Sequence, residues 1–175
     1  MANPPLITRL DARDRALLVR CAIGPATPPA ALHCWTALTV LGGARGNVLA
    51  ALAPALWPVT GRVLAVRALV ALIVSHLVVQ LVKRTVGRPR PSQRSGRCAL
   101  VVEPDRFSFP SGHAAASMSV ALAYASVEPG WFAPLVLVAA LVGASRVCLG
   151  VHYPGDVLAG QTIAVATVAA VLAGW

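Results

Sequence analysis

The stretch VLAVRALVALIVSHLVVQLV, residues 63–82, determines the fold class of this chain. A run of about 20 mostly apolar residues is long enough to cross the hydrocarbon core of a bilayer as a helix. Four further runs are also apolar, namely Asn47–Trp57, Ala114–Val127, Trp131–Ala144 and Val157–Gly174. Val157–Gly174 is close to spanning length, and the others reach it when small polar neighbours are included. The pattern predicts an all-α integral-membrane bundle.

Composition supports the same conclusion. Hydrophobic residues make up 57% of the 175 residues and charged residues only 12%, against roughly 25% charged residues in soluble domains. A soluble helical bundle would need charged outer faces on its helices, and these are missing. We therefore expect one membrane domain over residues 1–175 with five spans. Pro28–Leu41 is apolar but short, so six spans are the alternative.

The N-terminal segment, residues 1–28, differs from the rest. Acidic and basic side chains at positions 11–15 interrupt any apolar core of a signal peptide. Several leucines instead form a partial apolar stripe opposite arginines, which favours a helix lying in the membrane interface.

Three short motifs stand where the apolar runs begin or end. They are Lys83 with Arg90-Pro91, Pro110-Ser111-Gly112-His113, and Ser145-Arg146 followed by His152 and Asp156. Since consecutive spans are antiparallel, the motifs within residues 83–156 should all lie on one face of the membrane.

These residue types suit a phosphate site. Lys83, Arg90 and Arg146 could surround a phosphate, although basic residues at helix ends also serve as interfacial anchors. Ser111 and Gly112 open a helix, so their backbone N–H groups should be free to bind an anion.

His152 and Asp156 are four residues apart and should be neighbours in a helix or turn. A carboxylate that hydrogen-bonds one imidazole nitrogen fixes the tautomer and leaves the other nitrogen free to attack. A single histidine near a membrane surface would more often be structural, but this one is paired with a carboxylate.

Together the motifs resemble the signature of the type 2 phosphatidic acid phosphatase superfamily, which also includes bacterial acid phosphatases and vanadium haloperoxidases. The resemblance implies that His152 is the nucleophile, that Asp156 orients it, and that His113 protonates the leaving oxygen. It implies supporting roles for Pro91, Pro110 and Ser145. A metal phosphatase would need grouped carboxylates, whereas the six acidic residues of this chain are scattered, so we expect neither a metal nor another cofactor.

The polar segment from Gly87 to Pro110 lies between two motifs and should form a rim or lid over the site. Whether its arginines contact substrate stays open; they are Arg88, Arg94, Arg97 and Arg106. His76 and Gln80 share a helix face with Lys83 and could support it, or could serve helix packing alone.

The sequence therefore predicts a metal-independent lipid phosphate or diphosphate phosphatase. A polyprenyl-linked substrate is favoured, with phosphatidylglycerol phosphate or phosphatidic acid as alternatives. A non-catalytic membrane protein or a transporter on the same bundle is the rival of another class. The net charge of +9 fits anionic head groups rather than nucleic acid, because the basic residues lack interleaved aromatic residues.

We expect a multi-pass protein of the bacterial inner membrane whose partners are the bilayer and its lipid substrate. The side of the site depends on the number of spans. Five spans place the N-terminal arginines beside the site and favour a cytoplasmic one, whereas six favour the opposite side. These arginines are Arg9, Arg13, Arg15 and Arg20. The sequence predicts no oligomeric state.

Overall fold

The computed structural model describes residues 6–24, 26–57, 59–95, 99–103 and 105–174. The prediction of an all-α fold is confirmed, because the described residues form helices and no strand beyond one isolated bridge between Pro89 and Phe107. The α-helices are α1 (Leu6–Cys21), α2 (Pro29–Leu41), α3 (Ala44–Leu52), α4 (Val59–Val86), α5 (Pro91–Ser95), α6 (Gly112–Ala125), α7 (Phe132–Cys148) and α8 (Pro154–Ala173). Two short 3₁₀ helices, η1 (Ala53–Leu56) and η2 (Pro129–Trp131), extend α3 and precede α7.

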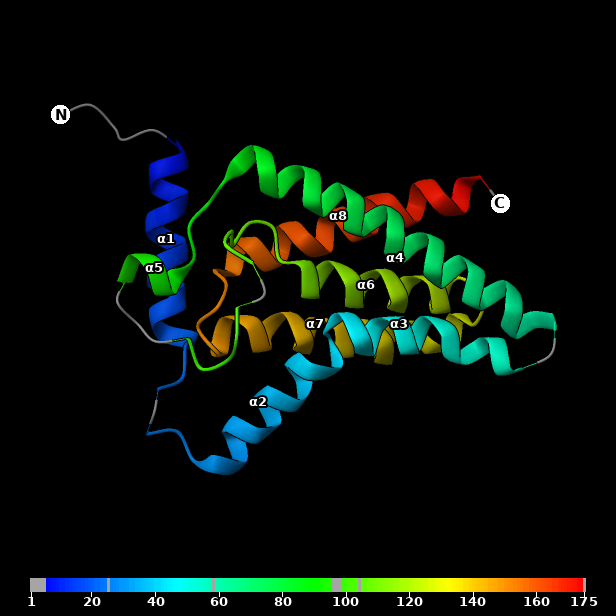
Figure 1. Cartoon of the computed structure of the whole chain (residues 1–175), viewed down its shortest axis with the longest axis horizontal. Helices are drawn as coiled ribbons and strands as arrows, with labels where there is room; N and C mark the ends of the chain where they lie inside the picture. The colour runs from blue at the N-terminus through cyan, green and yellow to red at the C-terminus, as the bar shows by residue number, and fades with distance from the viewer. Residues whose placement is uncertain (1–5, 25, 58, 96–98, 104, 175) are drawn as a thin grey trace.

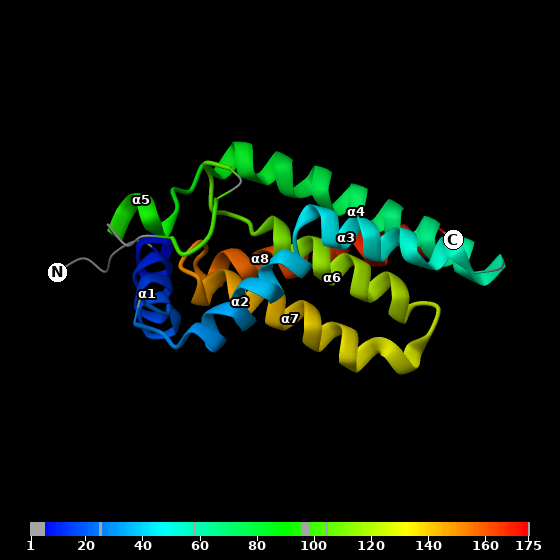
Figure 2. The same cartoon turned by 60° about the horizontal axis from the view of Figure 1, so that its bottom comes forward.

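Helix α6 lies at the centre of the bundle and packs against α4, α7 and α8 (Figures 1 and 2). Its buried positions are mostly small, including Ala114, Ala115, Ala121 and Ala123. Small residues let helix backbones approach closely, which is how helices associate where lipid removes the hydrophobic drive. The long helices therefore surround a short central one.

Among the described residues, three segments are long and apolar enough to cross a membrane, namely 60–86, 129–148 and 154–173. The pair α2 and α3–η1, bent by 57°, would be a fourth span if it crosses as one unit. Large apolar side chains such as Leu81, Leu137 and Leu158 are exposed on the outside of the bundle, as expected where lipid is the solvent. The membrane bundle is confirmed, while the count of five spans, which includes the 14-residue α6, stays a prediction.

Helix α1 lies across one end of the bundle rather than along it (Figure 1). Its Leu18 is buried against Val147, Tyr153 and Val157, which belong to α7, α8 and the turn between them. The predicted N-terminal helix is therefore present, and it packs on the end of the bundle where the motifs lie.

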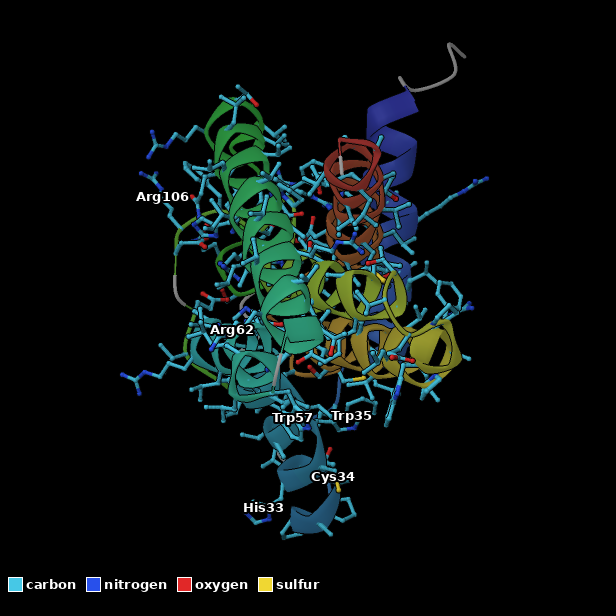
Figure 3. The ribbon with its side chains drawn as sticks, turned by 90° about the vertical axis from the view of Figure 1, so that its right-hand side faces the viewer. His33, Cys34, Trp35, Trp57, Arg62 and Arg106 are labelled. Carbon is cyan, nitrogen blue, oxygen red and sulfur yellow. The ribbon has the colours of Figure 1, made fainter. Side chains whose placement is uncertain are left out.

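Helix α2 extends away from the other helices, with His33 and Cys34 on its outer part (Figure 3). Both side chains are exposed. His33 therefore lies away from the packed bundle, which makes it a suitable control position for substitutions.

Candidate active site

The three motifs meet at the end of the bundle that α1 covers, as the alternation of the spans predicts (Figure 1). The C-terminal end of α4 supplies Lys83, and the N-terminal end of α6 supplies His113. The last turn of α7 carries Arg146, and the turn into α8 carries His152 and Asp156. Helix ends suit this purpose, because their unpaired backbone groups and projecting side chains converge where the chain leaves the apolar core.

His152 and Asp156 form the buried centre of the site. The Nδ1 atom of His152 lies 3.5 Å from Oδ2 of Asp156, and the same oxygen accepts a 2.8 Å hydrogen bond from the backbone N–H of Tyr153. Capping the first turn of α8 thus fixes the carboxylate beneath the imidazole. The opposite nitrogen of His152, Nε2, lies 3.4 Å from Nη1 of Arg90.

The environment keeps His152 neutral. Burial lowers the pKa of the imidazole to about 4, helped by the charges of Arg90 and Arg146 and opposed by Asp156. A neutral imidazole whose Nδ1 faces a carboxylate carries its lone pair on Nε2, here beside Nη1 of Arg90, which is the form that a nucleophile or a base requires.

Arg90 and Lys83 converge on Asp105. Arg90 donates to the backbone oxygen of Asp105 at 2.7 Å and to its Oδ1 at 3.0 Å, while Lys83 Nζ donates to Oδ2 at 2.8 Å. Arg90 also donates to the Val151 carbonyl at 2.8 Å, directly before His152. Burial raises the pKa of the Asp105 carboxyl, but Lys83 and Arg90 outweigh this and hold it below its ordinary value. A carboxylate therefore occupies donors that the sequence assigns to phosphate.

Arg146 and Ser111 keep donors without protein partners. Arg146 is 1% exposed and donates through Nη1 to the hydroxyl of Thr39 on α2. Within the described part of the chain, its Nε and Nη2 and the Oγ of Ser111 are buried with no hydrogen bond. Buried donors are rarely left unpaired, so these atoms are candidates for binding an anionic ligand.

One prediction about the start of α6 is wrong. The backbone N–H of Ser111 is not free for an anion, because it donates at 2.9 Å to the backbone carbonyl of Asp156. This bond ties the second motif to the third. Among the described residues, the N–H of Gly112 has no such partner and fits the prediction.

A cavity of about 520 Å³ opens beside these groups. Its polar part is lined by Lys83, Arg90, Asp105, His113 and His152. Its remaining walls come mainly from α3, α4 and α6 and include the apolar side chains of Val48, Leu72, Ile73 and Leu77. The cavity thus joins a charged end to an apolar groove between membrane helices.

His76 and Gln80 line the same cavity as Lys83, so the shared helix face predicted from their spacing is confirmed. Their side chains lie 3.4 Å apart, Nε2 to Nε2. They are the polar members of the otherwise apolar α4 wall that leads away from Lys83.

The three supporting residues lie around the site and not in its cavity. Pro91 and Pro110 are almost completely buried, Pro91 as the first residue of α5. Ser145 donates from its hydroxyl to the Val142 carbonyl at 2.6 Å, one turn earlier in α7.

The two ends of the segment from Gly87 to Pro110 lie together in the described part of the chain. The backbone N–H of Ser108 donates to the Arg88 carbonyl at 2.8 Å, beside the bridge of Pro89 to Phe107. Arg106 is exposed at the edge of the molecule (Figure 3). Arg97 lies outside the described residues. Arg88 and Arg94 bind aspartates of α1 and do not line the cavity.

Sequence reasoning missed three acidic residues of this region: Asp11, Asp14 and Asp105. Each is paired with a basic residue far away in the chain, and Asp105 lies 22 residues from Lys83. The available signal is the small number of acidic residues, since the chain has only six and places these three and Asp156 here.

Comparison with known proteins gives consistent results. The PAP2 superfamily model matches residues 64–175. Over 100 residues the chain is 40% identical to the decaprenylphosphoryl-5-phosphoribose phosphatase of Mycobacterium tuberculosis. The matched region covers 57% of this chain and 54% of that protein. The lipid A 1-phosphatase of Rhizobium etli is 33% identical over 99 residues, 50% of this chain and 40% of that protein. The chain therefore spans about half the length of the curated relatives that it matches.

Two solved structures share the fold. The PAP2-type phosphatidylglycerolphosphate phosphatase from Bacillus subtilis superposes with a TM-score of 0.75 at 23% identity, covering 94% of this chain and 85% of that one. LpxE from Aquifex aeolicus gives a TM-score of 0.73 at 24% identity, covering 85% and 88%.

Proposed function

We propose that this chain, which belongs to the PAP2 superfamily, is a membrane phosphatase that hydrolyses a lipid phosphomonoester or diphosphate through a phosphohistidine on His152. The observation that carries the proposal is the buried pair of His152 and Asp156 at the charged end of an apolar cavity. Such a site suits a substrate with an anionic head and an apolar tail.

The chemistry takes two steps. Nε2 of His152 attacks phosphorus, and the bond from phosphorus to the lipid oxygen breaks in line with the new N–P bond. His113 gives its proton to the departing oxygen. Water then attacks the phosphohistidine, its proton passes to His113, and the N–P bond breaks to release inorganic phosphate and the original imidazole.

Lys83, Arg90 and Arg146 would stabilise the charge on the phosphoryl oxygens during both steps. Arg146 supports this role through its two unpaired donors. Lys83 and Arg90 must exchange the Asp105 carboxylate for phosphate, so the two anions compete. The proposed chemistry needs neither metal nor cofactor, and this stays a prediction that a chelator tests.

For the substrate we propose a polyprenyl-linked phosphate. The apolar walls from α3 and α4 would hold the chain. His76 and Gln80 would face polar groups between the chain and the phosphate that is removed. The names of the mycobacterial relative and of the undecaprenyl-diphosphatase BcrC of Bacillus subtilis, which is 37% identical over 79 residues, support this class. Phosphatidylglycerol phosphate and phosphatidic acid remain the alternative substrates.

We further propose that the protein resides in the bacterial cell membrane as a multi-pass protein. The three apolar segments of spanning length among the described residues support a membrane location, and the bacterial relatives support the type of cell. The side on which the site opens stays a prediction tied to the number of spans. Labelling a cysteine placed at Gln93 from outside intact cells would decide it.

The test is release of inorganic phosphate by purified protein in mixed micelles. Substrates are a polyprenyl diphosphate, a polyprenyl phosphosugar phosphate, phosphatidylglycerol phosphate and phosphatidic acid. We expect the fastest release from a polyprenyl substrate, complete loss with His152→Ala, and full activity with the exposed control His33→Ala. EDTA should have no effect. No release from any substrate would favour the non-catalytic alternative, and magnesium-restored activity after EDTA would refute the metal-free mechanism.

A further inference from the structure

Arg88 lies directly behind the carboxylate that faces His152. Its Nη1 donates at 2.7 Å to Oδ1 of Asp156, the oxygen that does not face the imidazole. Its guanidinium carbon lies 4.1 Å from the centre of the Tyr153 ring, a cation–π contact within the same turn. Arg88 therefore contacts two residues of the turn that carries His152.

Helix α1 fixes Arg88 in turn. The same Nη1 donates at 2.7 Å to Oδ2 of Asp14, and Nη2 donates at 2.6 Å to Oδ1 of Asp11. The other oxygen of Asp14 accepts a 2.7 Å hydrogen bond from the backbone N–H of Gly155. Both acidic residues of α1 thus bind Arg88, and Asp14 also binds the turn that carries His152, although α1 precedes the part matched by the family model.

The groups in these contacts are mostly buried, so each charge depends strongly on its partner. The side chain of Asp156 is 0% exposed, that of Arg88 13% and that of Asp14 12%. A buried carboxylate without a cation would be protonated or would turn towards other donors. Arg88 binds one oxygen of Asp156 and leaves the second directed at Nδ1 of His152, the arrangement in which a carboxylate fixes the tautomer and orientation of an imidazole.

We propose that Arg88 is a positioning residue that acts through Asp156 on His152, and that Asp14 and Asp11 of α1 hold Arg88 in place. Both terminal nitrogens of Arg88 already donate to carboxylates of α1 and of the turn into α8, so its contribution is to the chemical step and not to phosphate binding. This inference rests on the proposed role of His152. It assigns the N-terminal helix a part in catalysis.

The expected effects separate positioning from binding. Arg88→Ala should lower kcat about 10- to 100-fold, the cost of misplacing a reacting group by about 1 Å. The KM and the inhibition constant of inorganic phosphate should stay within about threefold, because the cavity cations are untouched. Arg88→Lys should have a higher kcat than Arg88→Ala, because an ammonium restores the positive charge but not the two-pronged hydrogen bonding of a guanidinium. Asp14→Asn should give a smaller loss of kcat, about 3- to 10-fold.

A double-mutant cycle in the full chain tests the route. In the Asp156→Asn background, Arg88→Ala should lower kcat by less than about threefold further, because both changes remove the same orientation of His152. Arg94→Ala is the matched control: Arg94 binds Asp11 at 2.7 Å but is 42% exposed and does not contact Asp156. It should keep kcat within about twofold.

An equal loss of kcat in the wild-type and Asp156→Asn backgrounds would overturn the inference, as would a tenfold rise in the phosphate inhibition constant with kcat unchanged. If Arg88→Ala does not fold, Arg88→Lys and Asp14→Asn decide, and unchanged kcat in both would overturn the proposal. Wild-type protein that releases no phosphate would refute the proposed function itself. Active wild type with unaffected Arg88 variants would refute this inference alone.

Discussion

Substitution of Gly160 by alanine should lower kcat, although Gly160 is not a residue of the site. Gly160 belongs to α8 and faces the start of α6, where a Cβ atom would lie 2.5 Å from the Ser111 carbonyl oxygen. It would also lie 3.3 Å from the Ser111 carbonyl carbon and 3.4 Å from the Ala115 nitrogen. All three are backbone atoms, so no side-chain rotation can relieve the contact. Since carbon and oxygen normally approach to about 3.3–3.6 Å, the two helices must separate by about 1 Å.

That separation acts on the relative position of two motifs. Ser111 donates its N–H to the Asp156 carbonyl and stands two residues before His113, so the movement shifts His113 relative to His152. We expect kcat to fall about 100-fold and the free energy of unfolding to fall by about 1–3 kcal/mol, the usual cost of overpacking.

The assay combines phosphate release with thermal unfolding in the same detergent. Gly130→Ala is the control, because the added methyl group would have nothing within 4 Å, and it should change neither quantity. Gly160→Ala with kcat within threefold of wild type and an unchanged unfolding temperature would refute the proposed packing of α8 on the second motif.

Three further predictions concern individual groups of the site. His113→Ala should lower kcat about 10²–10⁴-fold on alkyl monophosphates. The fall in kcat should be much smaller on nitrophenyl phosphate, because its leaving group needs no proton. Equal falls on both substrates would mean that His113 is not the general acid. Asp105→Asn should lower the inhibition constant of inorganic phosphate about 3- to 10-fold by removing a competitor for Lys83 and Arg90, and a raised constant would show that Asp105 holds these cations ready. Burial lowers the pKa of His152 from 6.5 to about 4. Between these two pH values the unfolded chain binds more protons at this histidine than the folded chain does. The free energy of unfolding should therefore fall by about 3 kcal/mol as the pH is lowered from 6.5 to 4. His152→Gln should show a smaller loss by denaturant titration over that range, and an identical pH dependence would contradict the shifted pKa.

The local features of the site could be predicted because short-range geometry determines them. The four-residue spacing of His152 and Asp156 places them in one turn, and the apolar run before Lys83 brings that residue to a helix end. The bundle also follows from apolar runs that have no polar face. These inferences need only local spacing and the alternation of spans.

The ion-pair partners of the site could not be predicted in this way. Asp14 meets Arg88 across 74 residues, and nothing in the spacing of two charges specifies such a pairing. The bond from the Ser111 N–H to the Asp156 carbonyl also depends on how closely α6 and α8 pack. Both features arise from tertiary packing, which places α1 over the end of the bundle and lets Gly160 approach Ser111.

The central claim is that His152 carries the phosphoryl group during turnover. Rapid quenching in alkali of protein mixed with a ³²P-labelled lipid diphosphate, followed by peptide mapping, tests it directly, because phosphohistidine survives alkali and decays in acid. The account predicts acid-labile label on the peptide containing His152, present in wild type and His33→Ala and absent from His152→Ala. Label on another residue, or continued phosphate release by His152→Ala, would contradict it.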